Sequence, residues 1–416
     1  MFKLSKLAAL AVAAGAALTV QAGEVEVLHY WTSGGEAKSA AELKKMMQAK
    51  GHTWRDFAVA GGGGDSAMTV LKSRVVSGNP PSAAQVKGPA IQEWASEGVL
   101  ANMDGVAKAE KWDESLPKVV ADVMKYKGSY VAAPVNVHRV NWLWASSDAL
   151  KKAGVAAMPK TWDEFFAAAD KLKAAGLIPV AHGGQNWQDF TTFESVVLGV
   201  GGAKFYQDAL VKLDDKALGS DTMKKSLETF RRVKSYIDPG SPGRDWNLAT
   251  AMLIQGKAGF QLMGDWAKGE FVAAGKVPGK DFMCAAAPGT ASSFTFNVDS
   301  FILFKLKDAS AQKAQSDLAA AIMSPEFQEV FNLNKGSIPV RLGMKMDKFD
   351  DCAKLSSKDF VESAKTGGLV PSIAHGMAVA PAAEGAIKDV VSQFWNDDKI
   401  SVADAMKKIA QAAKTR

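Results

Sequence analysis

The sequence predicts an α/β protein whose N-terminal part is built around a parallel β-sheet. Three short apolar segments, at residues 25–30, 54–60 and 82–87, are typical of buried strands. Segments in which apolar residues recur every three or four positions, as in helices, alternate with these strands. The order strand, helix, strand, helix favours parallel strands that are joined by right-handed crossovers.

The helices between these strands have clear start and stop signals. Residues 37–50 have helical spacing and end at Gly51. Asp65 can cap the following helix, which ends at the Gly-Asn-Pro-Pro segment 78–81. A third helix begins with Pro89. Each of these helices is expected to connect or follow strands of the same sheet.

The pattern changes in the second third of the chain. Residues 131–137 are expected to form an extended crossover, followed by an apolar run at 140–145. Thr161 and Glu164 have the spacing of a capping box at a helix start, and residues 296–304 again resemble a strand. No repeat of fixed period and no low-complexity linker is visible, so two domains would be joined by short crossovers.

The N-terminal segment 1–22 is typical of a cleavable export signal. Lys3 and Lys6 precede an apolar run at residues 7–20, and a Val-Gln-Ala sequence supplies the small residues that a signal peptidase needs. The run is shorter than the ~20 residues that span a bilayer, and no cysteine follows it as a lipoprotein anchor would require. The mature chain is expected to begin near Gly23, outside the cytoplasm and in the periplasm.

Length and composition indicate a globular protein with more than one core. The chain has 416 residues, of which 47% are hydrophobic and 23% are charged. A chain of this length usually divides into two domains. The formal charge is +6, but the basic residues form no block, so neither a nucleic-acid groove nor a nucleic-acid partner is expected.

The chain has two cysteines, Cys284 and Cys352. In an oxidising compartment they can pair, which would stabilise the fold by about 4 kcal/mol in the chain-entropy model. The alternative is two buried free thiols. The predicted compartment favours the disulfide.

Four consecutive glycines, residues 61–64, follow the second predicted strand. They lack the lysine and the hydroxyl residue of a P-loop, and Ser66 stands where a dinucleotide-binding motif has its third glycine. A nucleotide site is therefore not expected. A close turn that offers backbone N–H groups to a ligand and a simple flexible loop remain as alternatives.

Motifs of catalysis and of metal binding are missing from the sequence. It contains no His-Glu-x-x-His, no Gly-x-Ser-x-Gly and no Cys-x-x-Cys. The five histidines are scattered, and none stands at metal-ligand spacing. No cofactor and no metal is expected. A glycosidase is not excluded by this, because it needs only two carboxylates that the fold brings together.

Three loops are expected to meet at one edge of the sheet. Residues 31–36, 61–64 and 85–87 all lie where predicted parallel strands end. Ligands of such sheets bind beyond the carboxyl ends of the strands. This convergence predicts a binding site at that edge.

Tryptophan is unusually frequent, with eleven residues against five tyrosines. A tryptophan ring can cover the apolar face of a pyranose while polar side chains bond its hydroxyl groups. The alternative for each tryptophan is a place in the core, which we expect for Trp94, Trp142 and Trp162. Trp31 and Trp266, which have polar and glycine-rich neighbours, are the strongest candidates for stacking. Trp187 and Trp246 have similar neighbours.

A few charged residues stand out by position. Lys87 ends a predicted strand, Lys335 lies in a predicted loop, and Asp299 interrupts an apolar stretch. Each has a structural alternative, such as a solvent-facing strand position for Asp299. His375, in a Ser-Ile-Ala-His-Gly loop, is also compatible with a purely structural role.

The chain resembles the extracellular solute-binding proteins of carbohydrate ABC importers, in the maltose-binding-type superfamily. It is most similar to the periplasmic glucose-binding proteins of pseudomonads. The segments that carry the resemblance are 27–36, 133–137, 159–165, 264–266 and 334–341. They extend from the first predicted strand almost to the end of the chain.

The resemblance implies two lobes, each a mostly parallel sheet flanked by helices, with the ligand in the cleft between them. The N-terminal lobe would comprise residues 23–132 and 286–340, and the C-terminal lobe residues 133–285 and 341–416. Carried over position by position, the ligand-binding residues would be Trp31, Glu36, Gln85, Lys87, Trp246, Trp266, Asp299, Lys335 and His375.

The function that the resemblance implies is the capture of glucose or a related monosaccharide for an inner-membrane ABC permease. The protein would be a monomer, would close its cleft around the sugar and would catalyse no reaction. One alternative is a secreted carbohydrate-active hydrolase that uses Glu36 with Asp265 or Asp299. Another is a sensor that presents its closed state to a chemoreceptor.

Overall fold

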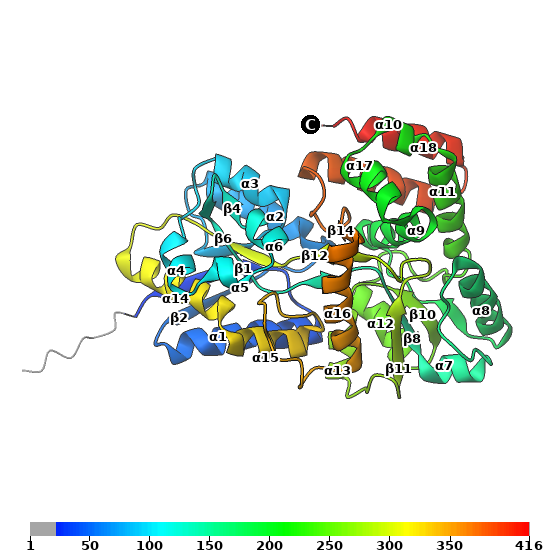
Figure 1. The fold of residues 1–416 in the computed structure, drawn as a ribbon, viewed down its shortest axis with the longest axis horizontal. Coiled ribbons are helices and arrows are strands. Elements are labelled where there is room, and N and C mark those ends of the chain that lie inside the picture. The colour runs from blue at the N-terminus through cyan, green and yellow to red at the C-terminus, as the bar shows by residue number, and fades with distance from the viewer. Residues whose placement is uncertain (1–21, 416) are drawn as a thin grey trace, which may run out of the picture.

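The computed structural model describes residues 22–415 and shows two lobes side by side (Figure 1). Each lobe has its own sheet and its own apolar core. The first lobe contains the sheet β2-β1-β3-β13-β6, and the second lobe contains the sheet β11-β8-β10-β9. The predicted export signal, residues 1–22, lies outside the described residues except for its last residue.

The first lobe confirms the predicted alternation of strands and helices. Its strands β1 (Glu24–His29), β2 (Thr53–Ala58) and β3 (Ala83–Gln85) are parallel. The sheet is completed by β6 (Ala132–Pro134) and β13 (Ser300–Leu303), which is antiparallel to both of its neighbours. The three parallel strands thus end at one edge, as expected.

The helices of the first lobe surround this sheet. Their bounds are α1 (Gly34–Ala49), α2 (Asp65–Val76), α3 (Pro89–Ser96), α4 (Asp104–Ala109), α5 (Trp112–Ser115), α6 (Lys118–Val123), α14 (Ala309–Met323) and α15 (Pro325–Lys335). Two short strands, β4 (Lys125–Tyr126) and β5 (Ser129–Tyr130), form a hairpin. Between β2 and α2, the glycines form a short turn, η1 (Gly62–Gly64).

The second lobe has a four-stranded sheet with helices packed around it. Its strands are β8 (Trp142–Ser146), β9 (Ile178–Val180), β10 (Ala258–Leu262) and β11 (Phe282–Ala286). Its helices are α7 (Ser147–Lys152), α8 (Trp162–Ala174), α9 (Asn186–Tyr206), η2 (Gln207–Val211), α10 (Asp215–Leu218), α11 (Asp221–Lys234), α12 (Trp246–Ile254), α13 (Ala267–Ala273), α17 (Pro381–Asn396) and α18 (Val402–Ala412). The predicted capping box begins α8, where the Glu164 backbone N–H donates to Thr161 Oγ1 over 3.2 Å.

The sheet of the second lobe is mostly parallel, as the resemblance implied, with β8 as its antiparallel strand. β8 is antiparallel to both β10 and β11, and β9 is parallel to β10, so β9, β10 and β11 run in one direction. The path of the chain explains the direction of β8. Because β8 carries the chain out of a crossover, it runs away from the other lobe, whereas its neighbours return towards it. β13 has the same position in the first lobe and is also antiparallel.

A small third sheet lies where the chain crosses between the lobes (Figure 1). It consists of β7 (His138–Arg139), β12 (Phe294–Asn297) and β14 (Leu369–Pro371). The prediction of one strand over 296–304 is therefore wrong, because β12 belongs to this small sheet and β13 to the first lobe. The chain changes sheets at Val298 and Asp299, so Asp299 stands at the crossing.

Helix α16 (Asp351–Thr366) lies between the two lobes in Figure 1. Its Cys352 forms a disulfide with Cys284 of β11. On the same helix, Asp359 accepts a hydrogen bond over 2.7 Å from the buried Arg139, whereas Phe360 packs in the first core. The helix thus contacts both lobes, and the predicted lobe boundaries stay predictions.

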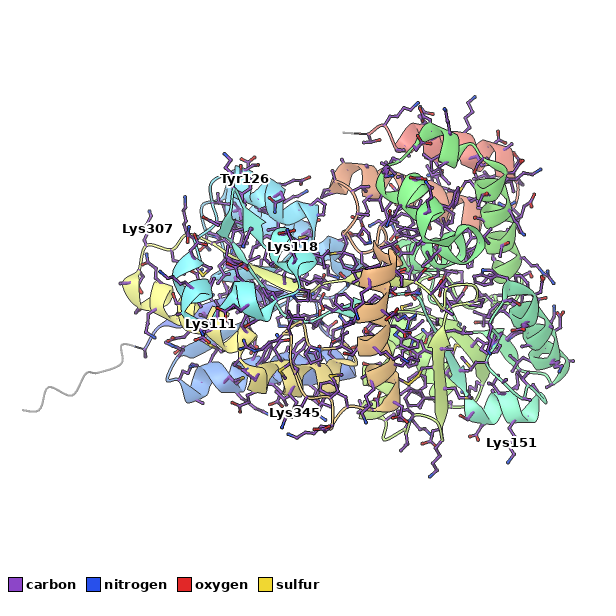
Figure 2. The ribbon with its side chains drawn as sticks, in the orientation of Figure 1. Lys111, Lys118, Tyr126, Lys151, Lys307 and Lys345 are labelled. Atoms are coloured by element: carbon purple, nitrogen blue, oxygen red, sulfur yellow. A yellow bond between two sulfur atoms is a disulfide. The ribbon has the colours of Figure 1, made fainter. Side chains whose placement is uncertain are left out.

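Both lobes carry exposed lysines. Examples that Figure 2 labels are Lys111, Lys118, Lys151, Lys307 and Lys345. They are dispersed, as the sequence indicated. Within residues 22–415, no helix has both the length and the apolar character needed to cross a membrane.

Candidate functional site

A cavity of about 320 Å³ lies between the lobes. Its wall includes the loop after β1, the end of β3, the segment between β12 and β13, and the loops that follow β10 and β14. All of the predicted ligand-binding residues except Gln85 belong to this wall. They are Trp31, Glu36, Lys87, Trp246, Trp266, Asp299, Lys335 and His375. The convergence that the strand ends predicted is present in the fold.

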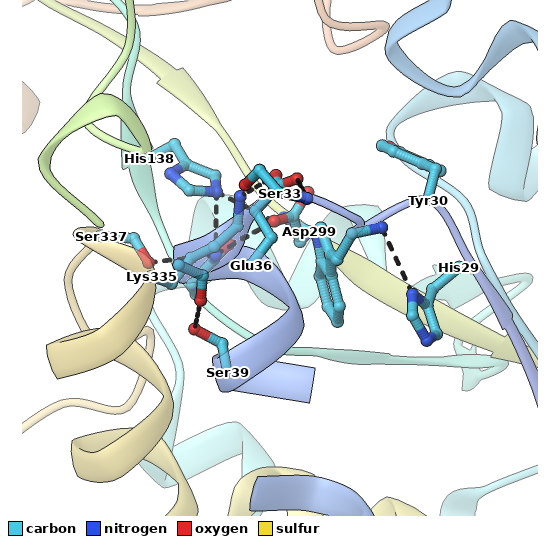
Figure 3. A network of polar contacts seen from close by, with 12 residues as sticks. His29, Tyr30, Ser33, Glu36, Ser39, His138, Asp299, Lys335 and Ser337 are labelled. Atoms are coloured by element: carbon cyan, nitrogen blue, oxygen red, sulfur yellow. Dashed lines mark hydrogen bonds and ion pairs between the residues drawn. The ribbon is translucent and has the colours of Figure 1, made fainter. Parts of the chain in front are cut away.

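Glu36 and Lys335 form an ion pair at one side of the cavity (Figure 3). Glu36 lies in the first turn of α1, where the helix dipole favours a carboxylate, and its Oε2 accepts from the Ser33 N–H over 3.5 Å. Its Oε1 is 2.6 Å from Nζ of Lys335, the last residue of α15. Because the Lys335 side chain is only 3% exposed, this pair is held in the wall rather than in solvent.

Asp299 is the most heavily bonded carboxylate of the wall. Its Oδ1 accepts from Gln85 Nε2 over 3.2 Å and lies 3.3 Å from Lys87 Nζ, while its Oδ2 is 2.9 Å from His138 Nε2. Burial alone would raise its pKa, but Lys87, His138 and Lys335 together hold the pKa well below the ordinary value of an aspartate. Asp299 is therefore ionised and serves as a hydrogen-bond acceptor.

His138 is a site residue that the sequence analysis missed. Its ring lies between two carboxylates, with Nδ1 bonded to Asp265 and Nε2 bonded to Asp299. Burial would lower the pKa of His138, yet the two carboxylates raise it above the ordinary value of a histidine. No sequence spacing could reveal this, because Asp265 and Asp299 reach His138 only through the fold.

Gln85 lies behind the cavity wall. It is fully buried, and its Oε1 accepts from the Tyr30 N–H over 3.3 Å while its Nε2 donates to Asp299. It lines an adjoining cavity of about 380 Å³. Its predicted place at the end of β3 is right, but in this structure it orients Asp299 and Tyr30 rather than facing the main cavity.

Aromatic rings from the second lobe form the opposite wall. The ring centroids of Trp266 and His375 are 4.8 Å apart, and Trp187 lies 5.9 Å from His375 and 6.4 Å from Trp266. Trp266 follows β10 and is 6% exposed. Trp187 was not among the predicted ligand-binding residues, although its glycine-rich and polar neighbours were the available signal.

The other two predicted tryptophans have different surroundings. Trp31 is 2% exposed and packs against Phe301 and Phe331, with ring centroids 5.5 and 5.0 Å away. It is therefore mainly a core residue with one part in the cavity wall. Trp246, at the start of α12, is half-buried and lines the cavity.

His375 enters the cavity wall from the loop after β14. Burial, Lys87 and His138 lower its pKa well below the ordinary value of a histidine, so its imidazole is neutral. Its Nε2 lies 3.0 Å from Thr191 Oγ1, and that hydroxyl already donates to the Trp187 carbonyl. His375 Nε2 must therefore carry the proton and donate to Thr191, which leaves Nδ1 as an acceptor.

Two polar atoms of the wall have no hydrogen-bond partner within the described part of the chain. They are Ser33 Oγ and Asn297 Oδ1, and both are buried. Buried polar groups are nearly always paired, so these two atoms are exceptions within the wall. Asn297 escaped the sequence analysis because it lay inside a single predicted strand.

The glycine turn brings the two lobes into contact. Gly63 has φ +60°, and a Cβ atom there would lie 2.9 Å from Trp187 Cγ. Gly64 has φ +114°, and a Cβ there would lie 3.0 Å from the Tyr30 ring. Side chains would not fit at either position, so these residues form a close turn that allows Trp187 to reach the first lobe. That the turn offers backbone N–H groups to a ligand stays a prediction.

Basic and acidic side chains are equally frequent in the wall. The bases are Lys87, Lys335 and His138, whose pKa is raised, and the carboxylates are Glu36, Asp245 and Asp299. Of the described residues, no arginine reaches the wall. No group of three or more His, Cys, Asp or Glu side chains within residues 22–415 could hold a metal ion. The arrangement suits an uncharged ligand that has many hydroxyl groups and an apolar face.

Comparisons with known proteins agree with this architecture. The model of the family described as bacterial extracellular solute-binding protein matches residues 16–324. A probable sugar-binding periplasmic protein of Brucella suis is 48% identical over 420 residues, which cover 99% of each chain. A probable sugar-binding periplasmic protein of Rhizobium meliloti is 50% identical over 392 residues, or 94% of each chain.

Solved structures share the fold. A chitin oligosaccharide binding protein matches with a TM-score of 0.80 and 18% identity, over 94% of this chain and 98% of its own. The bacterial solute receptor AcbH matches with a TM-score of 0.79 and 19% identity, over the same shares. At these identities the likeness concerns the fold alone. Together with the family model and the two relatives, it shows that the chain belongs to the family of bacterial extracellular solute-binding proteins.

Proposed function

We propose that this protein captures glucose or a related monosaccharide in the periplasm and delivers it to an inner-membrane ABC permease. The relatives from Brucella suis and Rhizobium meliloti, which match nearly the whole chain, are described as probable sugar-binding periplasmic proteins. The periplasmic location also accords with the predicted export signal.

The observation that carries this proposal is the composition of the cavity wall. A pyranose has one apolar C–H face and a rim of hydroxyl groups. The Trp187, Trp266 and His375 rings offer a surface for the face, and Glu36, Asp299 and Lys335 offer acceptors and donors for the rim. The volume of about 320 Å³ is at the small end of ligand cavities and favours a single sugar ring.

Closure of the lobes gives the mechanism of transport. In this structure the Gly35 N–H donates to Glu270 across the lobes over 2.9 Å, and Lys388 Nζ lies 3.0 Å from Asp65. A sugar that contacts both walls stabilises this closed arrangement over an open one. The closed form presents a fixed pair of lobe surfaces to the permease, and it is also the form that a chemoreceptor would recognise. The protein acts as a monomer.

The hydrolase alternative finds no support in the carboxylates. A glycosidase needs one carboxyl group with a raised pKa that can protonate the leaving oxygen. The pKa of Asp299 is instead held low, and Glu36 is paired with Lys335. Asp265 is engaged by His138 and by the Arg139 N–H. We therefore propose binding without a chemical step.

Isothermal titration calorimetry with a panel of sugars tests this function. The panel contains D-glucose, D-galactose, D-mannose, D-xylose and maltose, with glycerol 3-phosphate as a charged control. We expect D-glucose or another monosaccharide to bind with one site per chain, and chromatography to recover it unchanged. Silence towards every monosaccharide, or consumption of the sugar, would contradict the proposal.

A further inference from the structure

A buried carboxylate outside the cavity wall holds the loop that carries His375. Glu194 lies in the middle of α9 and is fully buried. Its Oε1 accepts from Ser372 Oγ over 2.7 Å, and its Oε2 accepts from the backbone N–H groups of Ile373 and Ala374 over 2.9 and 3.3 Å. One side chain thus binds three consecutive residues that lead directly into His375.

The same helix also holds the imidazole itself. Thr191, one turn before Glu194, lies 3.0 Å from His375 Nε2. Residues three positions apart lie on one face of a helix, so Thr191 and Glu194 face the loop together. Tyr206, at the end of α9, donates to Glu194 over 2.7 Å and contacts the Pro371 carbonyl over 2.9 Å. Helix α9 therefore fixes both the backbone and the side chain of the His375 segment.

This carboxylate is costly for the fold. Burial raises the pKa of Glu194 to about 7, even though hydrogen bonds from Ser372 and Tyr206 favour the ionised form. A neutral side chain of the same shape would avoid the loss of hydration. If position 194 only stabilised the lobe, it would not need a charged side chain. A carboxylate is needed at position 194 if the side chain must accept several hydrogen bonds from one segment.

We propose that Glu194 is a positioning residue of the ligand site, which fixes residues 372–374 so that His375 presents its imidazole to the cavity. The inference rests on the proposed function, because it takes His375 as a contact of the bound sugar. Glutamine is the informative replacement. Its amide oxygen accepts hydrogen bonds, but its NH₂ group is a donor and cannot replace the second oxygen facing the segment.

A double-mutant cycle at pH 8, with D-glucose in the calorimeter, separates positioning from general stability. We expect Glu194→Gln to weaken binding about 10-fold when His375 is present. In a His375→Ala background the same change should weaken it less than about twofold, because the contact that Glu194 positions is already lost. Losses that multiply in the double variant would overturn the proposal.

Asp189→Asn is the matched control. Asp189 is also a buried carboxylate of α9, but it bonds His182 and Ser392 instead of the His375 segment. Its replacement should leave the affinity for D-glucose within about twofold of the wild type. An affinity loss equal to that of Glu194→Gln would mean that any buried charge on α9 has this effect, against the proposal.

Two measurements on the sugar-free protein complete the test. Hydrogen exchange of the Ile373 and Ala374 amides should be faster in Glu194→Gln, and the unfolding temperature at pH 8 should stay equal or rise. Unchanged exchange, or a parallel loss of stability and affinity, would show a merely structural residue. If the wild type binds another monosaccharide of the panel instead of D-glucose, the cycle is measured with that sugar. If it binds none, the proposed function fails, and the exchange result still decides the role of Glu194.

Discussion

Replacing Gly88 by alanine should block closure of the cleft. Gly88 precedes α3 in the first lobe and has φ +49°. A Cβ atom at this position would lie 2.0 Å from the Gly376 carbonyl oxygen and 2.9 Å from Met377 Cα, in the loop after β14. Real Cβ atoms do not approach other atoms this closely, so the two segments would have to separate by about 1 Å or more.

The size of the effect follows from this overlap. Overpacking costs about 1–3 kcal/mol, and here the cost falls mainly on the closed form, in which the two segments meet. Because each 1.4 kcal/mol is a factor of ten, the Kd for sugar should rise about 5- to 150-fold. The strain of a side chain at positive φ, about 1–3 kcal/mol, is present in both open and closed forms and should appear in the unfolding temperature instead.

Calorimetry and small-angle scattering of the Gly88→Ala variant measure both consequences. Gly98→Ala is the matched control, since Gly98 also has positive φ (+69°) but a Cβ there would meet nothing within 4 Å. We expect both variants to lose stability, and only Gly88→Ala to lose affinity and to remain expanded when sugar is added. Equal affinities of the two variants would refute the reasoning.

Three further predictions concern the aromatic wall, the buried histidine and the disulfide. Trp266→Ala should weaken sugar binding by about 1–3 kcal/mol, measured by calorimetry on the folded variant, and an unchanged Kd would make Trp266 purely structural. The pKa of His138 is raised on folding, so its contribution to the stability of the fold is full below pH 6.5 and is lost as the pH rises through the pKa of the folded state. The pKa of Asp299 is lowered on folding, so its contribution is present above pH 3.8 and is lost at acid pH. Thermal unfolding from pH 5 to 9 should therefore show an alkaline decrease that is smaller in His138→Gln; equal slopes would contradict it. The double variant Cys284→Ser with Cys352→Ser removes the disulfide and opens a loop spanning 68 positions. Its free energy of unfolding, measured by denaturant titration, should be about 4 kcal/mol lower than that of the wild type. An unchanged midpoint of the titration would contradict this prediction.

The parts of the fold that were predictable depend on local signals. β1, α1, β2 and α2 follow from apolar periodicity and from stop signals such as Gly51, so they could be placed to within a few residues. The split of residues 296–304 between two sheets could not be seen, because nothing local marks a crossover between lobes. The antiparallel direction of β8 has the same origin.

The site was predictable where it lies on strand ends. Glu36 and Lys87 follow directly from the β-α order. Lys335 was predicted to lie in a loop but ends α15, and only the family resemblance tied it and His375 to the ligand. His138 was missed because its role depends on two distant carboxylates, Asp265 and Asp299. Trp187 has the polar and glycine-rich neighbours that are typical of a stacking tryptophan. Only its contacts with Gly63 and His375, which depend on the fold, distinguish it from a core tryptophan.

A crystal structure of the mature chain grown with D-glucose would test the central claim most directly. We predict one pyranose in the cavity between the lobes, with its apolar face on the Trp187 and Trp266 side and its hydroxyl groups bonded to Glu36 and Asp299. We also predict that the lobes are in the closed arrangement described above. Density for the sugar outside this cavity, or a cavity that stays empty at saturating concentrations of D-glucose and of every other monosaccharide of the panel, would contradict it.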